Sequence, residues 1–181
     1  MKKYLPRLVF VVVLLLTISF VFSSCQKENF SKYYINGMEA FSAKKYDEAL
    51  LNFNRAIVLE PDFAQSYYLR AHTHFNMENY KEAIADYTKC IDYDPNHTEA
   101  YYWRGEAYYD LEDYGNAISN YSEAIKLDSD NTYYYYSRGT TYYLRDINDD
   151  FSKSIDDYRK GCELGHNRSC KALKGLLDLR R

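Results

Sequence analysis

An internal repeat with a period of 34 residues constrains this chain more than any other feature. When the sequence is aligned with itself at that offset, residues of the same type recur in the same columns. The first half of each unit has two aromatic columns and a small column, namely Tyr33, Tyr67, Tyr101 and Tyr135; Tyr34, Tyr68, Tyr102 and Tyr136; and Gly37, Ala71, Gly105 and Gly139. Because self-similarity at such a period marks repeat architectures, we expect one structural unit repeated along the chain.

The second half of each unit has its own columns. Its small, aliphatic and aromatic positions are Ala49, Ala83 and Ala117; Leu50, Ile84 and Ile118; Phe53, Tyr87 and Tyr121; Ala56, Cys90 and Ala124; and Ile57, Ile91 and Ile125. This order of residue types resembles the tetratricopeptide repeat (TPR), and the resemblance covers about residues 30–165. It implies an all-α fold, a right-handed α-solenoid of about four TPR helix pairs plus a C-terminal capping helix, and a role in protein binding.

Helix-capping and helix-breaking residues place the boundaries of the units. The predicted TPR domain spans residues 31–165, with repeats at about 30–63, 64–97, 98–131 and 132–165. Ser31 is the expected N-cap of the first helix, and Pro61 and Pro95 stop second helices because proline disfavours helix in the residue before it. About three extra residues separate the two helices of the fourth unit. Gly165 is expected to end that unit, and residues 166–181 are expected to form a capping helix.

The N-terminal residues have the pattern of an export signal. Three basic residues lie among the first seven, residues 8–22 are mostly apolar, and small residues follow. The stretch Phe22-Ser23-Ser24-Cys25 resembles the lipobox of bacterial lipoproteins, in which the cysteine takes lipid and becomes the mature N-terminus, although Phe replaces the usual Leu. We interpret residues 1–24 as a lipoprotein signal peptide and residues 25–30 as a lipid-anchored tether, with lipid on Cys25. An ordinary signal peptide or a signal anchor is the alternative.

This interpretation predicts a location at the cell envelope, lipid-anchored to a membrane, with the outer membrane favoured and the domain periplasmic or surface-exposed. The leader holds three basic and no acidic residues, so its removal changes the formal charge from −3 to −6. Because nucleic-acid binding needs a basic stripe to meet the phosphates, we expect no nucleic-acid partner. The expected partners are a protein or peptide and the membrane that holds the anchor.

In a TPR stack the first helix of each unit lines a concave surface, so the resemblance implies a ligand groove. Its predicted residues follow spacings of four and then three, which keep each trio on one helix face. They are Tyr34, Met38 and Phe41; Tyr68, His72 and Phe75; Tyr102, Glu106 and Tyr109; and Tyr136, Thr140 and Tyr143. Tyrosine suits such a surface because it offers a large rigid ring and a hydrogen-bonding hydroxyl. The alternative is that these tyrosines only cover the core and meet water.

Two further features of the first helices concern ligand chemistry. Some TPR domains hold the C-terminal carboxylates of chaperones with a clamp of Lys, Asn and Arg. The aligned positions here are Tyr34, Met38, Leu69, Glu99 and Trp103, so the clamp is absent. Arg70, Arg104 and Arg138 form a separate column. We interpret this column as inter-repeat salt bridging or helix packing, with anion recognition as the alternative.

Cys162 and Cys170 flank the last predicted turn. An exported chain meets an oxidising compartment, where disulfides persist. Residues 161–165 (GCELG), followed by a second Cys, also resemble the disulfide-bearing helix pairs of Sel1-like repeat proteins, which implies a bridge that clips the capping helix to the last repeat. The alternatives are two free thiols or metal binding with His166, although three ligands at this spacing match no zinc signature. Cys90 is expected to be an inert buried thiol.

The sequence contains no recognisable catalytic constellation. It has no Gly-rich phosphate loop, no His-Glu-x-x-His motif and no nucleophile elbow, and we expect neither cofactor nor metal. We therefore expect a non-enzymatic protein–protein interaction module, a membrane-tethered TPR scaffold that binds a peptide or protein segment in its Tyr-rich groove. The alternatives are a structural stabiliser of an envelope complex that uses its convex face, and a carbohydrate-binding lipoprotein.

Overall fold

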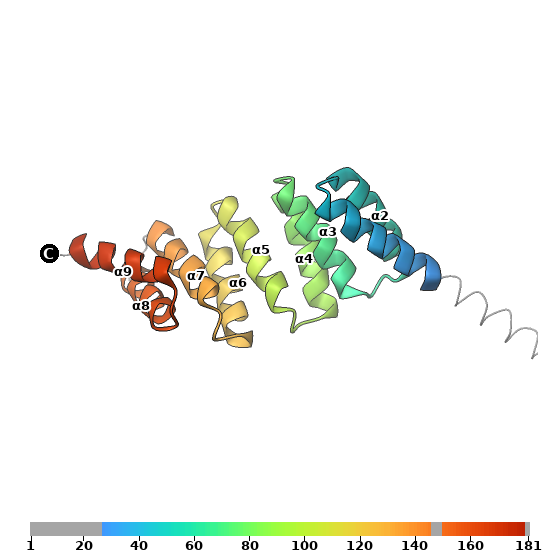
Figure 1. The fold of residues 1–181 in the computed structure, drawn as a ribbon. Helices are drawn as coiled ribbons and strands as arrows, with labels where there is room; N and C mark the ends of the chain where they lie inside the picture. Colours follow the sequence, from blue (N-terminus) through green and yellow to red (C-terminus); the bar gives the residue numbers. More distant parts are fainter. Residues whose placement is uncertain (1–26, 146–149, 180–181) are drawn as a thin grey trace, which may run out of the picture.

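The computed structural model describes residues 27–145 and 150–179, and every regular element in these ranges is a helix. A helix over residues 27–42 is followed by α2 (Tyr46–Leu59), α3 (Ala64–Asn76), α4 (Tyr80–Tyr93), α5 (Thr98–Asp110), α6 (Tyr114–Leu127), α7 (Thr132–Arg145), α8 (Asp150–Glu163) and α9 (Asn167–Leu179). Figure 1 shows the helices side by side in one elongated row. Each helix packs mainly against its neighbours in the sequence. The prediction of an all-α solenoid of consecutive helix pairs is confirmed.

The first helix begins earlier than the sequence predicted. Residues 27–30 are already helical, and Ser31, the expected N-cap, lies inside the helix, where its Oγ donates to the carbonyl of Lys27 at 3.1 Å. Phe30 is buried, with its ring 5.7 Å from that of Tyr34 and 5.3 Å from that of Phe63. Because burying a Phe side chain contributes about 2 kcal/mol, this contact favours a longer helix. Residues 27–30 therefore extend the first helix of the first unit.

Small residues let the two helices of a unit approach closely. Ala83 and Ala117 are fully buried, and so are the aromatic side chains of Tyr87 and Tyr121 four residues later in the same helices. In the third unit a Cβ on Gly105 would lie 2.8 Å from the ring of Tyr121, closer than real Cβ atoms come to other atoms. The small columns therefore mark the places where two helices meet around a buried ring.

The turns inside the first three units share a backbone conformation that the sequence did not reveal. Lys44, Glu78 and Glu112 have φ values of 58°, 61° and 61°, in the left-handed region that favours Gly. In the second unit the amide of Glu78 donates to the carbonyl of Phe75 and the amide of Asn79 donates to that of His74, both at 2.9 Å. These two bonds form a Schellman motif that ends α3.

Replacing Glu78 by Gly is expected to raise the free energy of unfolding by about 1 kcal/mol. The left-handed conformation costs a residue with a side chain roughly 1–2 kcal/mol, whereas Gly adopts it without strain but loses more backbone entropy on folding. Urea denaturation followed by circular dichroism measures the change. Ala85→Gly, at an exposed position of α4, is the matched control and is expected to lower stability by about 1 kcal/mol. Lower stability in both variants would contradict strain at Glu78.

An ion pair links the two helices of the fourth unit. Residues 146–149, which fall in the predicted insertion, lie outside the described ranges. Arg145 at the end of α7 donates to both carboxylate oxygens of Asp150, at 2.7 and 2.9 Å. Asp150 is the buried first residue of α8, where the partial positive charge of a helix N-terminus favours a carboxylate.

The C-terminal helix α9 packs on α8 and covers the end of the row. Leu176 of α9 is buried against Ile155 and Tyr158 of α8. The helices come closest at Gly161, where a Cβ would lie 2.5 Å from the Oγ of Ser169. This contact requires Gly, which stands where the second and third units have Cys and Ala.

The turn between α8 and α9 carries a disulfide. Cys162 and Cys170 are bonded to each other, with their Cα atoms 4.7 Å apart. Between them Gly165 has a φ of +92°, which only Gly adopts readily, and it follows the last residue of α8 by two positions. The disulfide therefore joins the capping helix covalently to the fourth unit.

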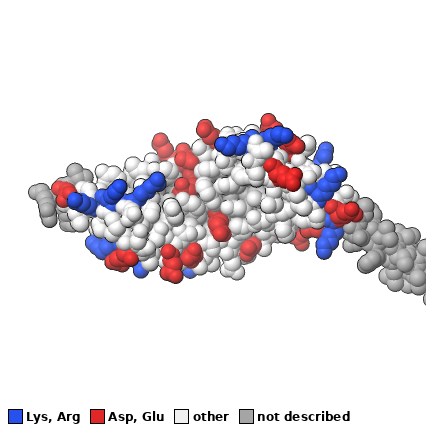
Figure 2. All heavy atoms as spheres, in the orientation of Figure 1, with Lys and Arg blue, Asp and Glu red and all other residues white. Residues whose placement is uncertain are grey.

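The predicted signal peptide at residues 1–24 and the predicted lipidation site Cys25 lie outside the described residues. Within residues 27–145 and 150–179, no helix combines the length and the apolar character needed to cross a membrane. On the face drawn in Figure 2, acidic and basic side chains are interspersed, and the middle of that face is largely uncharged.

Candidate functional site

The first helices of the units contact one another along the solenoid. α3 contacts α5, and α5 contacts α7. Aromatic rings bridge these contacts: the ring centroid of His72 is 5.5 Å from that of Phe41 and 4.6 Å from that of Trp103. Tyr102 continues the series, 5.3 Å from Trp103 and 5.1 Å from Tyr134. The row thus carries a continuous run of rings from the first helix to α7.

His72 is at the centre of this run in the second unit. Its ring stacks with those of Tyr68 and Phe75, at 5.9 and 6.3 Å, and meets Trp103 edge-on. Its Nδ1 lies 3.1 Å from the hydroxyl oxygen of Tyr87, at hydrogen-bond distance. Burial among these rings lowers the pKa of His72, because an imidazolium would lose its hydration there. His72 is therefore neutral at pH 7.

Acidification is expected to destabilise the fold partly through His72. The pKa of an exposed His is about 6.5, so as pH falls below that value the unfolded chain binds a proton that the folded His72 resists, and stability is lost. We expect the decrease in unfolding free energy between pH 7.5 and 5.5 to be smaller in His72→Gln than in the wild type. Urea denaturation at the two pH values measures this, and NMR titration reports the ring directly. A His72 pKa at or above 6.5 would contradict the proposed cause.

Three of the predicted groove tyrosines are partly buried against neighbouring rings. Tyr34 packs on Phe30 and Phe63 at the N-terminal end. Tyr68 lies 4.6 Å from His97, and burial raises the pKa of Tyr68 to about 12. Tyr102 contacts Tyr121 and Tyr134, and burial raises its pKa as well. For these residues the alternative interpretation, that the ring covers the core, describes the contacts better than a ligand groove does.

Other predicted groove residues are more accessible. Met38 and Tyr143, in the first and fourth units, have exposed fractions of 43% and 44%. Met38 lines a shallow hollow on the first helix together with Ile35 and Glu39. Phe41 packs against Tyr46 and His72. The predicted surface is thus a mixture of covered and open rings.

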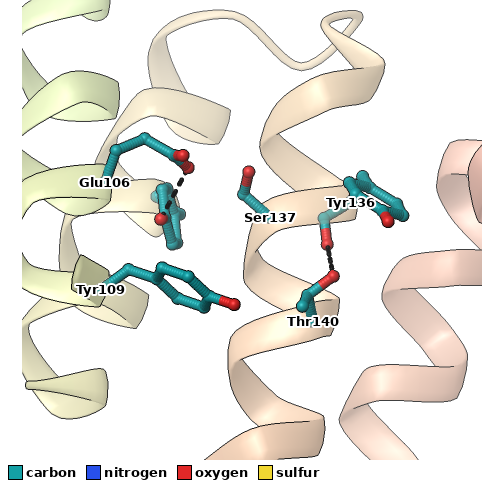
Figure 3. A pocket seen from close by; sticks show the side chains of 6 residues that line it. Glu106, Tyr109, Tyr136, Ser137 and Thr140 are labelled. Atoms are coloured by element: carbon teal, nitrogen blue, oxygen red, sulfur yellow. Dashed lines mark hydrogen bonds between the residues drawn. The ribbon is translucent and has the colours of Figure 1, made fainter. Parts of the chain in front are cut away.

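Four of the twelve predicted groove residues come together around a cavity between α5 and α7. The cavity has a volume of about 200 Å³ and is lined by Glu106, Tyr109, Tyr121, Tyr136, Ser137 and Thr140 (Figure 3). The hydroxyl of Tyr121 donates to Oε1 of Glu106 at 2.7 Å. The Oγ1 of Thr140 donates to the carbonyl of Tyr136 at 2.9 Å. The cavity therefore combines aromatic surface, hydroxyls and one carboxylate.

The carboxylate of Glu106 is partly removed from water. Burial raises the pKa of Glu106, while hydrogen bonds from Tyr121, Ser137 and Tyr102 oppose that shift and the negative charge of Asp110 adds to it. No Lys or Arg in the described chain forms an ion pair with Glu106, and the charge of Asp110 that acts on it has the same sign. The site therefore holds a carboxylate whose charge the protein itself does not neutralise.

Three residues of this surface were not predicted from the sequence. Tyr121 was assigned to the core, yet its hydroxyl reaches the cavity and binds Glu106. Trp103 and Ser137 occupy the column that follows the second tyrosine column. Each of these two residues lies three positions before a predicted groove residue, Glu106 or Thr140, and therefore on the same helix face. Applying this spacing to the sequence would have added both residues to the predicted groove.

Comparisons with known proteins agree with this architecture. The family model described as anaphase-promoting complex, cyclosome, subunit 3 matches residues 42–124, and the TPR repeat model matches residues 105–145. Residues 105–145 thus match the TPR repeat, and the fold is a TPR solenoid. A comparison with curated proteins gives no match.

Solved structures share the TPR fold. A crystal structure of MamA has a TM-score of 0.76 at 22% identity, covering 84% of this chain and 86% of that one. MamA from Desulfovibrio magneticus RS-1 gives 0.72 at 17% identity, covering 84% and 96%. The first TPR domain of Spaghetti (RPAP3), bound to the HSP90 peptide SRMEEVD, gives 0.59 at 25% identity, covering 64% and 91%. These likenesses show that the helix pairs of this chain have the TPR fold.

The Arg column of the TPR units joins each first helix to second helices. The Nε and Nη2 of Arg70 donate to Asp86 at 2.7 and 2.6 Å, and its Nη1 donates to Asn54 of the preceding unit at 2.6 Å. Arg138 donates to both oxygens of Asp157 in the same way, at 2.8 and 2.7 Å. The ion pairs therefore lie within one unit, and the bond to the preceding unit goes to a neutral side chain. The column corresponds to helix packing rather than to inter-repeat salt bridging or anion recognition.

Arg104 departs from that arrangement. Its Nε donates to Oδ1 of Asn120 at 2.7 Å and its Nη1 to Thr88 at 2.9 Å, so an amide stands where the second and fourth units have a carboxylate. Burial lowers the pKa of Arg104, because the cation is desolvated without a carboxylate bonded to it.

The cysteines and histidines form no metal site in the described ranges. No three His, Cys, Asp or Glu side chains there are grouped so as to hold a metal ion. His166 instead lies within hydrogen-bond distance of Ser169, with its Nδ1 2.8 Å from the hydroxyl oxygen. Cys90 is a fully buried free thiol, and burial raises its pKa to about 12, so it is protonated and unreactive at neutral pH.

Proposed function

We propose that this protein is a membrane-tethered scaffold that binds a peptide or protein segment along its first helices at the cell envelope. The observation that carries the proposal is the open cavity between α5 and α7, which adjoins a run of aromatic rings on neighbouring first helices. Rigid rings with hydroxyl groups give large contact area at low entropic cost, which suits recognition of an extended segment. The Spaghetti TPR domain, bound to the peptide SRMEEVD, is a structural relative with such a ligand.

The proposed location rests on the N-terminal sequence. A lipid on Cys25 would place the solenoid a few residues from the membrane surface, because the first helix is already present at residue 27. Acyl chains contribute about 0.8 kcal/mol for each buried CH₂ group, so a lipoprotein anchor would hold the protein stably, with the outer membrane favoured. We expect Cys25→Ala to be released from membranes on fractionation. Retention of this variant in the membrane fraction would disprove the lipid anchor.

The binding proposal is tested by affinity capture from envelope extract with the full-length protein in detergent. The test variant is Tyr109→Ala, Tyr143→Ala, which removes a ring that lines the cavity and an exposed ring on the next first helix. Tyr93→Ala, an exposed ring on the second helix α4, is the control, and circular dichroism confirms that all variants fold. We expect a partner that binds the wild type and the control but not the test variant. Equal binding to all three would mean that another face is used, as in a convex-face stabiliser.

A further inference from the structure

We propose that the cavity between α5 and α7 is a subsite for one cationic side chain, Lys or Arg, of the bound protein segment, with Glu106 as its counter-charge. This inference rests on the proposed function, because it assigns the chemistry of the ligand that the groove receives. It concerns the six lining residues, which come from α5, α6 and α7 (Figure 3).

The charge of the groove is the first argument. Glu106 is the only acidic residue among the twelve predicted groove residues, since the other titratable members are tyrosines and His72. Its Oε1 accepts a hydrogen bond from the hydroxyl of Tyr121. A carboxylate has about four acceptor positions, so Glu106 can accept one further donor besides Tyr121, Ser137 and Tyr102. These hydrogen bonds come from neutral groups, so a bound cation would supply the counter-charge that Glu106 lacks.

The walls of the cavity are the second argument. The ring of Tyr109 on α5 borders the cavity, and Figure 3 shows its hydroxyl pointing toward α7. The ring of Tyr136 on α7 is turned the other way, 5.8 Å from Tyr158 and 5.1 Å from His166. Aromatic faces attract ammonium and guanidinium groups. The Ser137 and Thr140 hydroxyls add oxygen atoms that accept hydrogen bonds. A carboxylate, the Tyr109 ring and hydroxyl oxygens suit a cation on a long apolar stem.

Acidic residues around the cavity also favour a cationic ligand. Glu99 and Asp110 lie seven residues before and four residues after Glu106 in α5, which places them along the same helix side, and both are exposed. Asp110 adds to the negative potential at Glu106. An acidic segment such as the SRMEEVD peptide bound by the Spaghetti domain would be repelled here. The partner segment is therefore expected to be basic.

The experiment selects ligands from random sequences, so the natural partner need not be identified first. A library of random 12-residue peptides is panned on the full-length protein in detergent, and the affinities of enriched peptides are measured for the wild type and for Glu106→Gln. The Gln variant keeps an oxygen that accepts from Tyr121 and removes only the charge. Glu82→Gln, at an exposed position of α4, removes the same charge away from the cavity. Circular dichroism confirms folding.

We expect enriched peptides to share a Lys or Arg whose replacement by Gln weakens binding about tenfold or more. Glu106→Gln should weaken binding by a similar factor, and the two changes together should have little further effect, because both remove one interaction. Glu82→Gln should leave the affinity unchanged. Glu106→Lys should reverse the preference toward peptides with Asp or Glu.

Two results would overturn the subsite, and they differ in what they imply for the groove. Enriched peptides that need Tyr109 and Tyr143 but bind wild type and Glu106→Gln equally would leave the binding groove in place without a cation site. Failure to enrich any peptide would remove both the subsite and the proposed peptide-binding function.

Discussion

Tyr87→Ala is expected to lower the free energy of unfolding by about 3–5 kcal/mol, the range for removing a buried aromatic ring. Tyr87 has no exposed surface, and its ring lies 5.9 Å from that of Tyr68. It belongs to the buried cluster that joins α3, α4 and α5. Its small neighbours Ala71 and Ala83 have no side-chain volume with which to fill the space, so a cavity would remain. In a stack stabilised by nearest-neighbour interfaces, this loss affects both sides of the second unit.

Urea denaturation followed by circular dichroism measures the effect of Tyr87→Ala. Tyr87→Phe is the matched control, since it keeps the ring and removes only the hydroxyl near His72, which should cost about 1 kcal/mol. The Cys90 thiol gives a second measurement, because it is fully buried in the same cluster. Its reaction with a thiol reagent should be faster in Tyr87→Ala than in the wild type. A stability loss below about 1 kcal/mol would mean that the neighbours collapse into the space.

Asp157→Ala is expected to lower the free energy of unfolding by about 3 kcal/mol. Asp157 accepts two hydrogen bonds from Arg138, and the two side chains have exposed fractions of only 8% and 20%. Removing the carboxylate leaves a partly buried guanidinium without its counter-charge, which is more harmful than removing both partners. Thermal or urea denaturation measures the loss.

Asn120→Asp is the complementary control for Asp157→Ala. It supplies Arg104 with the carboxylate that the second and fourth units already have, and is expected to raise stability by about 1 kcal/mol. The gain is limited because Asp cannot replace the hydrogen bond that Nδ2 of Asn120 donates to the Asn116 carbonyl. If the two variants both lowered stability, the charge of the carboxylate would not be what stabilises these contacts.

The repeat period specifies most of the architecture. Columns such as Ala83 with Tyr87 indicate where two helices meet and which ring fills the contact, and the structure has both residues fully buried. The pairing of a small residue with an aromatic residue is local, since it depends on helix periodicity within one unit. The same pairing then recurs in the next unit, 34 residues later. For that reason the helix pairs, the buried small columns and the protected thiol of Cys90 could all be predicted from the sequence.

The composition of the cavity depended on packing between units. Glu106 and Thr140 were predicted to share a surface, but the sequence could not show that Tyr68 and Tyr102 are partly buried against Tyr87 and Tyr121. Nor could it show that the Tyr121 hydroxyl reaches Glu106 from a second helix. Which side chain stays open depends on the angle between successive helix pairs, and that angle results from contacts among many residues at once.

The sequence by itself therefore determined that the chain is a stack of helix pairs, because its repeated pattern of small and aromatic residues suits one local packing arrangement. Only the tertiary structure decided where the first helix starts, because Phe30 packs on Phe63 at the other end of the first unit. It also decided the strained turn at Glu78, where the sequence has no Gly to indicate a left-handed residue. It also decided the position of the uncompensated carboxylate of Glu106 between two units. These features depend on contacts between residues distant in sequence or on backbone geometry, and residue types alone specify neither.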